Sequence, residues 1–125
     1  MNTTTNAPVF ATTVFQASRK HLRLPFAGKA ELTAMRNGRH LTAQVSEIGP
    51  RGCYVDTPEA FKVGTKVSMF IRNADESCVL SGTVLYVHKG WGMGILFDER
   101  QPEAFATLDN WLAELAEQQA HAVVH

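Results

Sequence analysis

The sequence contains few of the features that mark membrane proteins and disulfide or metal frameworks. Its 125 residues include two cysteines, Cys53 and Cys78, and neither belongs to a Cys-x-x-Cys pair or has a histidine at metal-ligand spacing. No apolar run approaches the roughly 18 residues that span a membrane, and no basic-then-apolar signal peptide opens the chain. We therefore expect a cytoplasmic protein without membrane insertion, in which both cysteines are buried free thiols.

Catalytic signatures are equally scarce. The chain contains no Gly-x-Ser-x-Gly, no His-Glu-x-x-His and no phosphate-binding loop that ends in Gly-Lys-Ser/Thr. Its five histidines are scattered singly along the sequence. Gly90, Gly92 and Gly94 form a Gly-x-Gly-x-Gly pattern, but no helix follows, so close backbone packing at a strand is favoured over dinucleotide binding. We expect no catalysis, no metal ion and no cofactor.

Neither sign of charge is in excess, because Lys plus Arg and Asp plus Glu each total 12. This balance argues against a general DNA-binding protein and against a polybasic membrane binder. The charges are nevertheless separated along the chain. Residues 1–40 hold six Lys or Arg and one acid, Glu31, whereas residues 41–125 hold six Lys or Arg and eleven acids. An anionic ligand is therefore expected to bind near the beginning of the chain.

The central part of the sequence has a β pattern. From Ala27 onward, strand-like segments at Lys29–Met35 and His40–Val45 flank Asn37-Gly38, which is a strong hairpin signal. Gly82 is expected to mark a bend or bulge in a long later strand. The later predicted strands are Cys53–Val55, Thr65–Arg72, Cys78–His88 and Trp91–Phe97. About six short strands in succession predict an all-β antiparallel barrel or sandwich.

The end of the sequence changes to a helical period. Pro102 suits a first helical position, and an apolar stripe predicts one amphipathic helix over Pro102–Gln119 that packs on the barrel. The stripe consists of Phe105, Leu108, Trp111, Leu112 and Leu115. We therefore expect one domain at residues 19–120, preceded by a flexible leader at 1–18 and followed by a frayed tail at 121–125.

The basic run before the first strand carries the main functional signal. Arg19 and Arg23 are separated by three residues, and a loop at Glu47–Gly52 follows between two predicted strands. An arginine offers a flat, always-charged fork that binds phosphates and stacks on purines. An Arg-x-x-x-Arg pair followed at this distance by such a loop resembles the PilZ domain, a bacterial family of six-stranded β-barrels that receive the second messenger cyclic di-GMP. The resemblance covers Ser18 to about Leu115 and implies a barrel closed by one helix.

The resemblance also implies the site residues. Arg19 and Arg23 match the family's two arginines, which hold phosphates and stack on guanine. The family's second motif, (Asp/Asn)-x-Ser-x-x-Gly, matches the loop in two registers. One runs from Gln44 to Gly49 and keeps Ser46, and the other runs from Glu47 to Gly52 and replaces the serine with Gly49.

We choose the second register, because the family's last glycine leads directly into the next strand and Gly52 does so here. It makes Arg19, Arg23, Glu47, Gly49 and Gly52 the cyclic di-GMP-binding residues. The loss of one neutral hydrogen bond at Gly49 costs on the order of 1 kcal/mol, or about fivefold in affinity.

Three functions remain open at this point. The first is a cyclic di-GMP receptor whose basic arm folds over the nucleotide and passes the signal to a protein partner. The second is a ligand-independent PilZ-like adaptor that docks a motility or pilus component. The third is a barrel that binds single-stranded nucleic acid through Tyr54, Trp91 and the basic arm, which the acidic barrel and helix oppose. The partner's identity, the ligand stoichiometry and the oligomeric state are left open.

Overall fold

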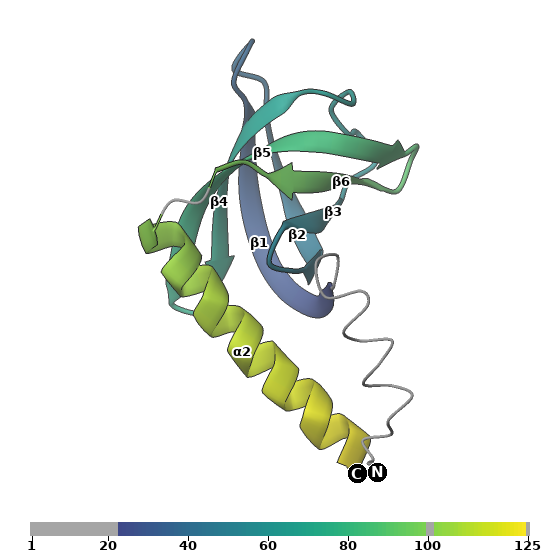
Figure 1. The fold of residues 1–125 in the computed structure, drawn as a ribbon. Helices are drawn as coiled ribbons and strands as arrows, with labels where there is room; N and C mark the ends of the chain where they lie inside the picture. Colours follow the sequence, from purple (N-terminus) through teal and green to yellow (C-terminus); the bar gives the residue numbers. More distant parts are fainter. Residues whose placement is uncertain (1–22, 100–101, 125) are drawn as a thin grey trace.

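The structure is a computed structural model that describes residues 23–99 and 102–124, with side chains described through residue 120. The elements are β1 (Leu24–Ala34), β2 (His40–Ile48), β3 (Gly52–Asp56), β4 (Lys66–Asn73), β5 (Glu76–His88), β6 (Gly92–Phe97) and α2 (Pro102–Val124). The predicted leader at residues 1–18 lies outside the described residues. The predicted class, a six-stranded antiparallel barrel with a C-terminal helix, is confirmed (Figure 1).

The six strands form a closed barrel in the order β1-β2-β3-β6-β5-β4, and every neighbouring pair is antiparallel. β1 has 11 residues and pairs with both β2 and β4. Closure removes the unpaired strand edges that otherwise invite aggregation. β3 pairs with β6 rather than with β4, so residues 52–56 and 92–96 lie side by side in the sheet although they are far apart in the sequence.

The core follows from the alternation of side chains along the strands. In β1, Leu24, Phe26 and Leu32 are among the residues that face inward, and the intervening positions are mostly exposed. Side chains from all six strands meet inside the barrel, and Val45, Val55 and Ile95 are fully buried there. The barrel interior is therefore a packed core of aliphatic and aromatic side chains.

The hairpin between β1 and β2 forms where Asn37-Gly38 predicts it. Gly38 adopts a φ of 74°, and the Asn37 side chain accepts a hydrogen bond of 2.9 Å from the Arg39 amide. The strand that leads into it begins at Leu24, three residues before the predicted start at Ala27. Pro25 is accommodated because the β1–β2 register shifts between Pro25 and Gly28.

The prediction of a bend or bulge at Gly82 is wrong. The irregularity in β5 lies between Val84 and Tyr86, in the pairing with β6. A Cβ atom at Gly82 would lie 2.6 Å from the side chain of Ile95 and 2.8 Å from the carbonyl oxygen of Leu96. Gly82 is therefore required by close packing against β6 rather than by a change of strand direction.

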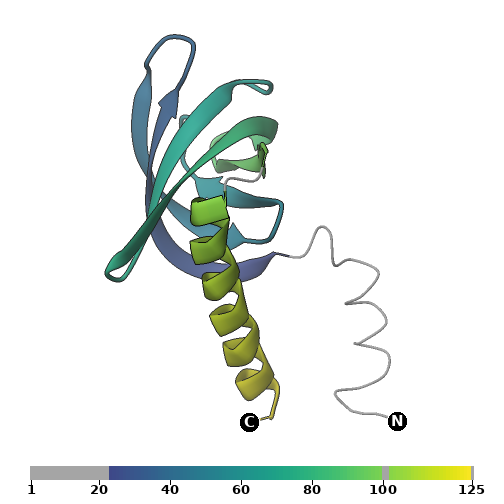
Figure 2. The ribbon, with the colours of Figure 1, turned by 60° about the vertical axis from the view of Figure 1, so that its left-hand side comes forward.

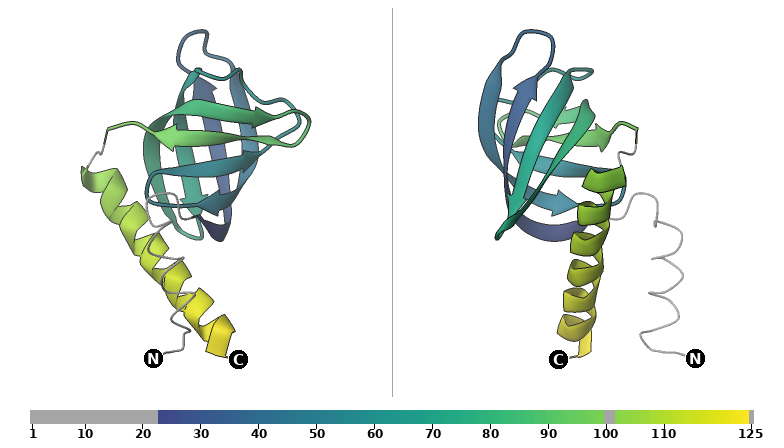
Figure 3. Two further views of the ribbon diagram at one scale, coloured as in Figure 1. Left: turned by 45° about the vertical axis from the view of Figure 1, so that its right-hand side comes forward. Right: turned by 90° about the vertical axis from the view of Figure 1, so that its left-hand side faces the viewer.

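Helix α2 packs against β1 and β5 through its apolar stripe. Phe105, Leu108 and Trp111 are buried, and Leu112 and Leu115 are partly buried against the same core. The helix ends at Val124 rather than near Gln119, and its second half extends beyond the strands in every view (Figures 1, 2 and 3). No helix in the described part of the chain is long and apolar enough to cross a bilayer.

Candidate functional site

The predicted site residues lie where β1 begins and where β2 turns into β3. Arg23 immediately precedes β1, Glu47 lies near the end of β2, and Gly52 is the first residue of β3. Gly49 lies in the turn between these two strands. Arg19 lies outside the described residues. The sequence-predicted set is therefore gathered at one end of the barrel, as far as the structure describes it.

Arg23 is held on the outside of the barrel by a tyrosine from β5. Its Nη1 atom donates a hydrogen bond of 2.8 Å to the hydroxyl oxygen of Tyr86. Its Cζ atom lies 5.8 Å from the centroid of the same ring, which is within the usual range of a cation–π contact. A guanidinium carries five N–H donors, so this hydrogen bond occupies only a fraction of its binding capacity.

Gly52 packs closely against β6 and lies near the guanidinium of Arg23. A Cβ atom at Gly52 would overlap the carbonyl oxygen of Ile95 on β6 and would lie 3.4 Å from Nη2 of Arg23. The glycine is therefore needed for the pairing of β3 with β6, whereas the guanidinium of Arg23 lies at ordinary contact distance from this position. Arg23 and Gly52, which are far apart in the sequence, are neighbours in the structure.

A row of outward-facing positions continues from the loop across four strands. Glu47 pairs with Tyr54, Tyr54 pairs with Gly94, and Gly94 pairs with Tyr86. A Cβ atom at Gly94 would overlap the ring of Tyr86, so this ring lies over a position that has no side chain. The row therefore begins with a carboxylate on β2 and ends with the tyrosine that holds Arg23.

A parallel row contains the second glycine of β6. Asp56 pairs with Gly92, and Gly92 pairs with His88. A Cβ atom at Gly92 would overlap the carbonyl oxygen of Val55 and would lie 2.8 Å from the ring of Tyr54. The predicted close packing is confirmed at Gly92 and Gly94, and it creates the shallow strip on which the tyrosines rest. The prediction is wrong for Gly90, which lies in a turn with a φ of 82° and has open space around it.

Three aromatic rings cluster over this strip. Tyr86 and His88 have ring centroids 5.2 Å apart, Tyr54 and His88 are 5.7 Å apart, and Tyr54 and Tyr86 are 6.3 Å apart. The hydroxyl oxygen of Tyr54 lies 3.1 Å from Nδ1 of His88 and shares a hydrogen bond with it. We call Tyr54, Tyr86 and His88, together with Arg23, the aromatic platform. Its flat groups suit the stacking of planar bases.

The electrostatics of the platform keep its central phenol neutral. Desolvation raises the pKa of Tyr54, and the nearby Asp56, Tyr86 and Glu47 raise it further. The phenol therefore stays protonated at neutral pH. Glu47 itself is exposed at the edge of the platform, opposite Pro25 on β1 and Tyr54 on β3.

The turn between β2 and β3 bears on the two registers of the second motif. The amide of Gly49 donates a hydrogen bond of 2.9 Å to the carbonyl oxygen of Gly52. The hydroxyl of Ser46 donates a hydrogen bond of 3.0 Å to Asp56 across a register shift between Val45 and Glu47. Ser46 thus already has a protein partner, whereas Glu47 faces the aromatic platform.

Sequence reasoning missed Tyr86 and His88, and it considered Tyr54 only as a contact for single-stranded nucleic acid. Two signals were available: Tyr86 and His88 alternate on one side of a strand, and Gly92 and Gly94 alternate on the next. Joining these signals requires the register of β5 with β6, which pattern alone does not supply. Trp91, the other aromatic considered for nucleic acid, is 78% exposed.

Both cysteines are buried free thiols, as predicted. Burial raises the pKa of Cys53 to about 12, against an opposing effect of Arg23, and burial raises the pKa of Cys78 to about 11. Neither thiol is a ready nucleophile, because the thiolate is the reactive form. In the described residues, no three His, Cys, Asp or Glu side chains are grouped so that they could hold a metal ion.

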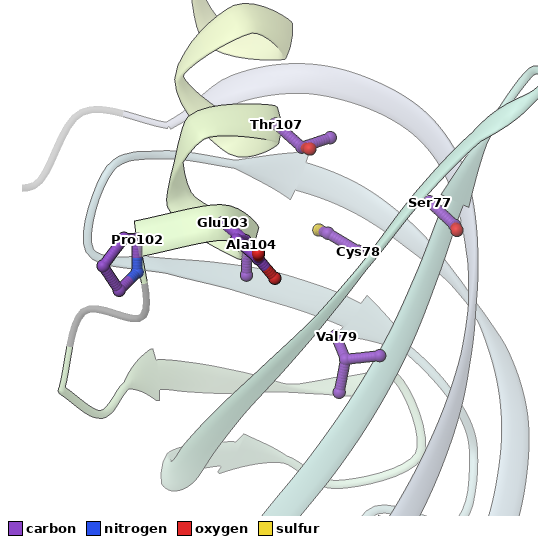
Figure 4. Close-up of a pocket in the computed structure, with 7 residues that line it drawn as sticks. All are labelled: Ser77, Cys78, Val79, Pro102, Glu103, Ala104 and Thr107. Atoms are coloured by element: carbon purple, nitrogen blue, oxygen red, sulfur yellow. The ribbon is translucent and has the colours of Figure 1, made fainter.

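Apart from the aromatic platform, a hollow of about 720 Å³ lies between β5 and the first turns of α2. Figure 4 shows the side chain of Cys78 directed from β5 toward the helix, near Ala104 and Thr107. Among the described residues that line it, Glu103 supplies the one charged group. The described residues that line this hollow include no lysine or arginine, and the aromatic platform, which contains Arg23, is therefore the stronger candidate for an anionic ligand.

Comparison with known proteins places these features in a family. The sequence model of the PilZ domain matches residues 17–114. No curated protein sequence matches the chain. Among solved structures, the apo form of K. pneumonia MrkH aligns with a TM-score of 0.67 at 12% identity, over 81% of this chain and 52% of that one.

The PilZ domain of CeSA from a cellulose-synthesizing bacterium aligns with a TM-score of 0.61 at 15% identity. That alignment covers 76% of this chain and 98% of the CeSA domain. The chain thus spans about half the length of the MrkH chain, at 52%, and nearly all of the CeSA domain. Structural similarity at such low identity establishes a shared fold.

Proposed function

Since this chain belongs to the PilZ domain family, a family of cyclic di-GMP receptors, we propose that it binds cyclic di-GMP at the aromatic platform. The observation that supports this most directly is the position of Arg23, whose guanidinium is bonded to Tyr86 and adjoins Gly52. In our proposal, Arg19 and Arg23 hold the phosphates and stack on guanine. PilZ domains are typically non-enzymatic receptors, and we propose the same here.

The chemistry of the platform fits both parts of the ligand. A guanidinium fork donates two parallel, charge-assisted hydrogen bonds to a phosphate. The carboxylate of Glu47 can accept hydrogen bonds from the N1–H and N2–H₂ edge of a guanine, one methylene further out than an aspartate would. The rings of Tyr54 and Tyr86 offer faces for a base, and base–aromatic stacking contributes about 1–3 kcal/mol per base.

We further propose that the protein acts in the cytoplasm and passes the ligand signal to a protein partner. The alternative is a ligand-independent adaptor. Two observations favour that alternative: Gly49 stands where the family has serine, and the residues of α2 from 116 to 120 are exposed. The helix extends past the strands there and offers a surface for docking (Figure 2).

A calorimetric titration separates these functions. The full chain is titrated with cyclic di-GMP, with GMP and with single-stranded RNA at physiological salt. The receptor proposal predicts saturable binding of cyclic di-GMP and much weaker binding of the other two. Absence of cyclic di-GMP binding would reject the receptor and favour the adaptor, and preferential RNA binding would reject both.

The degenerate loop gives a prediction of increased affinity. Gly49→Ser adds a hydroxyl, and Glu47→Asp restores the shorter carboxylate, so the double variant should bind cyclic di-GMP about five- to thirtyfold more tightly. Among the described glycines, those with positive φ are Gly38, Gly64 and Gly90. Serine at position 49 therefore meets no left-handed strain. Calorimetry of each single variant and of the double variant measures the gain.

The register from Gln44 to Gly49 predicts the opposite effects on cyclic di-GMP affinity for variants of the same loop. If Ser46 is the motif serine, Ser46→Ala weakens binding and Gly49→Ser does not strengthen it. Our register expects Ser46→Ala to leave the affinity within about twofold, because the Ser46 hydroxyl is bonded to Asp56. A small loss of stability is expected from that hydrogen bond, on the order of 1 kcal/mol.

Tyr86 should influence the ligand through its hold on Arg23. Tyr86→Phe keeps the ring but removes the hydroxyl that accepts from Arg23, so we expect about a fivefold loss of cyclic di-GMP affinity. Gly94→Ala should weaken binding at least as much, because the new methyl group displaces the Tyr86 ring. Leu85→Ala is the control, since Leu85 is the exposed neighbour of Tyr86. Equal affinities for wild type, Tyr86→Phe and Gly94→Ala would contradict this role.

A further inference from the structure

A basic hollow lies at the end of the barrel that carries the β1–β2 turn. It has a volume of about 510 Å³ and is lined by the β1–β2 turn and the connection that leads into β4. Its charged lining residues are Arg36, Arg39, Lys62 and Lys66. The lining residues among the described part of the chain include no aspartate and no glutamate. We call these four cations and the space between them the basic hollow.

Most of this positive charge has no acidic partner in the part of the chain that the structure describes. Lys66 lies 3.5 Å from Asp98, and this is the one ion pair formed by the four cations within the described residues. The Cζ atom of Arg39 lies 5.4 Å from the centroid of the Phe61 ring, which orients the guanidinium without neutralising it. Within the described residues Arg36, Arg39 and Lys62 have no acidic partner, and their exposed side chains leave the positive charge open to an anion.

The basic hollow is separate from the aromatic platform. β1 starts beside Arg23 and runs for 11 residues before it reaches the turn that contains Arg36. At ~3.3 Å per residue the two ends of this strand are roughly 30 Å apart along its path. In Figure 1 the β1–β2 turn projects at the top of the barrel, whereas α2 lies at the bottom. The two sites share no residue, and β5 connects them: Gly64 and Thr65 of the hollow are hydrogen-bonded to Val84, two residues before Tyr86 of the platform.

The residues beside the cations add an apolar component. Val63 lines the hollow and is 62% exposed, and Met35, which begins the β1–β2 turn, is 53% exposed. Exposed aliphatic side chains next to Arg and Lys are typical of surfaces that meet the headgroup region of an anionic bilayer. The arginine forks themselves match the geometry of a phosphate group from any source.

We propose that the basic hollow is a second anion site, which binds the phosphate group of a phospholipid headgroup or of a soluble polyphosphate. Arg36 and Arg39 supply the forks, and Lys62 supplies a further positive charge. The proposal depends only on the charges and shape of this end of the barrel. It therefore stands or falls independently of cyclic di-GMP binding at the platform.

The test uses the full chain and a double variant, Arg36→Gln with Arg39→Gln. Binding is measured to vesicles of phosphatidylglycerol with phosphatidylcholine and, separately, to inorganic tripolyphosphate. At a lipid surface each lost cation should cost about fivefold, so the double variant should bind roughly 25-fold more weakly. Val63→Ser should weaken vesicle binding but not tripolyphosphate binding, which distinguishes the two sources of phosphate.

A matched control removes the same charge elsewhere. Lys29→Gln with Arg72→Gln alters an exposed pair on β1 and β4, in a hollow that also contains Asp75 and Glu76. This control should bind vesicles and tripolyphosphate within about threefold of wild type, and the Arg36/Arg39 variant should keep its melting temperature and its cyclic di-GMP affinity. The proposal would be overturned if the wild type bound neither the vesicles nor tripolyphosphate. It would also be overturned if both double variants lost binding affinity equally.

Discussion

Replacing Trp111 with alanine is expected to lower the free energy of unfolding by about 3–5 kcal/mol, the usual cost of truncating a buried aromatic residue. The Trp111 side chain is fully buried, and its ring centroid lies 5.5 Å from that of Phe26 on β1. Its Nε1 atom also donates a hydrogen bond of 2.9 Å to Glu76 on β5. This one residue thus joins the helix to two strands of the barrel, and urea denaturation measures the loss.

Two further variants separate the contributions of Trp111. Trp111→Phe keeps most of the buried ring and removes the hydrogen bond to Glu76, so it should lose about 1–2 kcal/mol. Leu112→Ala should cost less than Trp111→Ala, because Leu112 is only partly buried. If Trp111→Ala keeps wild-type stability but abolishes self-association or partner binding, this helix face serves a partner instead of the barrel.

Replacing Arg23 with alanine is expected to weaken cyclic di-GMP binding about tenfold or more, since a charge-assisted hydrogen bond contributes roughly 1.5–3 kcal/mol. Arg19→Ala should have a similar effect under the same proposal. Arg23→Lys should recover little, because lysine lacks both the fork and the flat stacking face. The free energy of unfolding should change by on the order of 1 kcal/mol, since Arg23 lies outside the core and contributes one partly buried hydrogen bond.

Arg72 supplies a matched control for Arg23. Its Cζ atom lies 5.9 Å from the ring centroid of Phe70, so both arginines lie beside an aromatic ring. Arg72 is on β4, which is not among the strands that carry the aromatic platform. Arg72→Ala should leave cyclic di-GMP affinity within about twofold of wild type. Equal effects at positions 23 and 72 would point to a general charge effect rather than to a site.

Local signals in the sequence predicted most of the fold. Asn37-Gly38 predicts the hairpin because a tight turn needs positive φ, and Gly38 has it. The apolar stripe that includes Phe105 and Trp111 predicts the helix and its buried face. These features depend on neighbours within a few residues, so pattern alone is sufficient to locate them.

Features that depend on distant contacts were misplaced. β1 begins before Pro25 because a register shift with β2 accommodates the proline, and such a shift is not visible in one strand alone. The sequence predicts a bend or bulge at Gly82. The structure instead requires a glycine there because Ile95 and Leu96 leave no space for a side chain. The helix extends to Val124 beyond the end of its apolar stripe.

The candidate site likewise contains residues that a local motif predicts and residues that only the strand order brings together. The motif resemblance singled out Arg23, Glu47 and Gly52, and the structure gathers them at one end of the barrel. Tyr86 and His88 escaped notice because their proximity to Tyr54 requires β6 to lie between β3 and β5. The order of strands in a closed barrel, unlike a hairpin, is a property of the whole chain.

The most direct test of cyclic di-GMP binding at the aromatic platform is an NMR titration of the ¹⁵N-labelled full chain. We predict saturable shifts of the amide signals of Arg23, Glu47, Gly52, Tyr54 and Tyr86 upon addition of cyclic di-GMP, and much smaller shifts upon addition of an equal concentration of GMP. Signals from the β1–β2 turn at residues 35–39 should stay in place. An unchanged spectrum at saturating cyclic di-GMP, or shifts confined to another face of the barrel, would contradict the account.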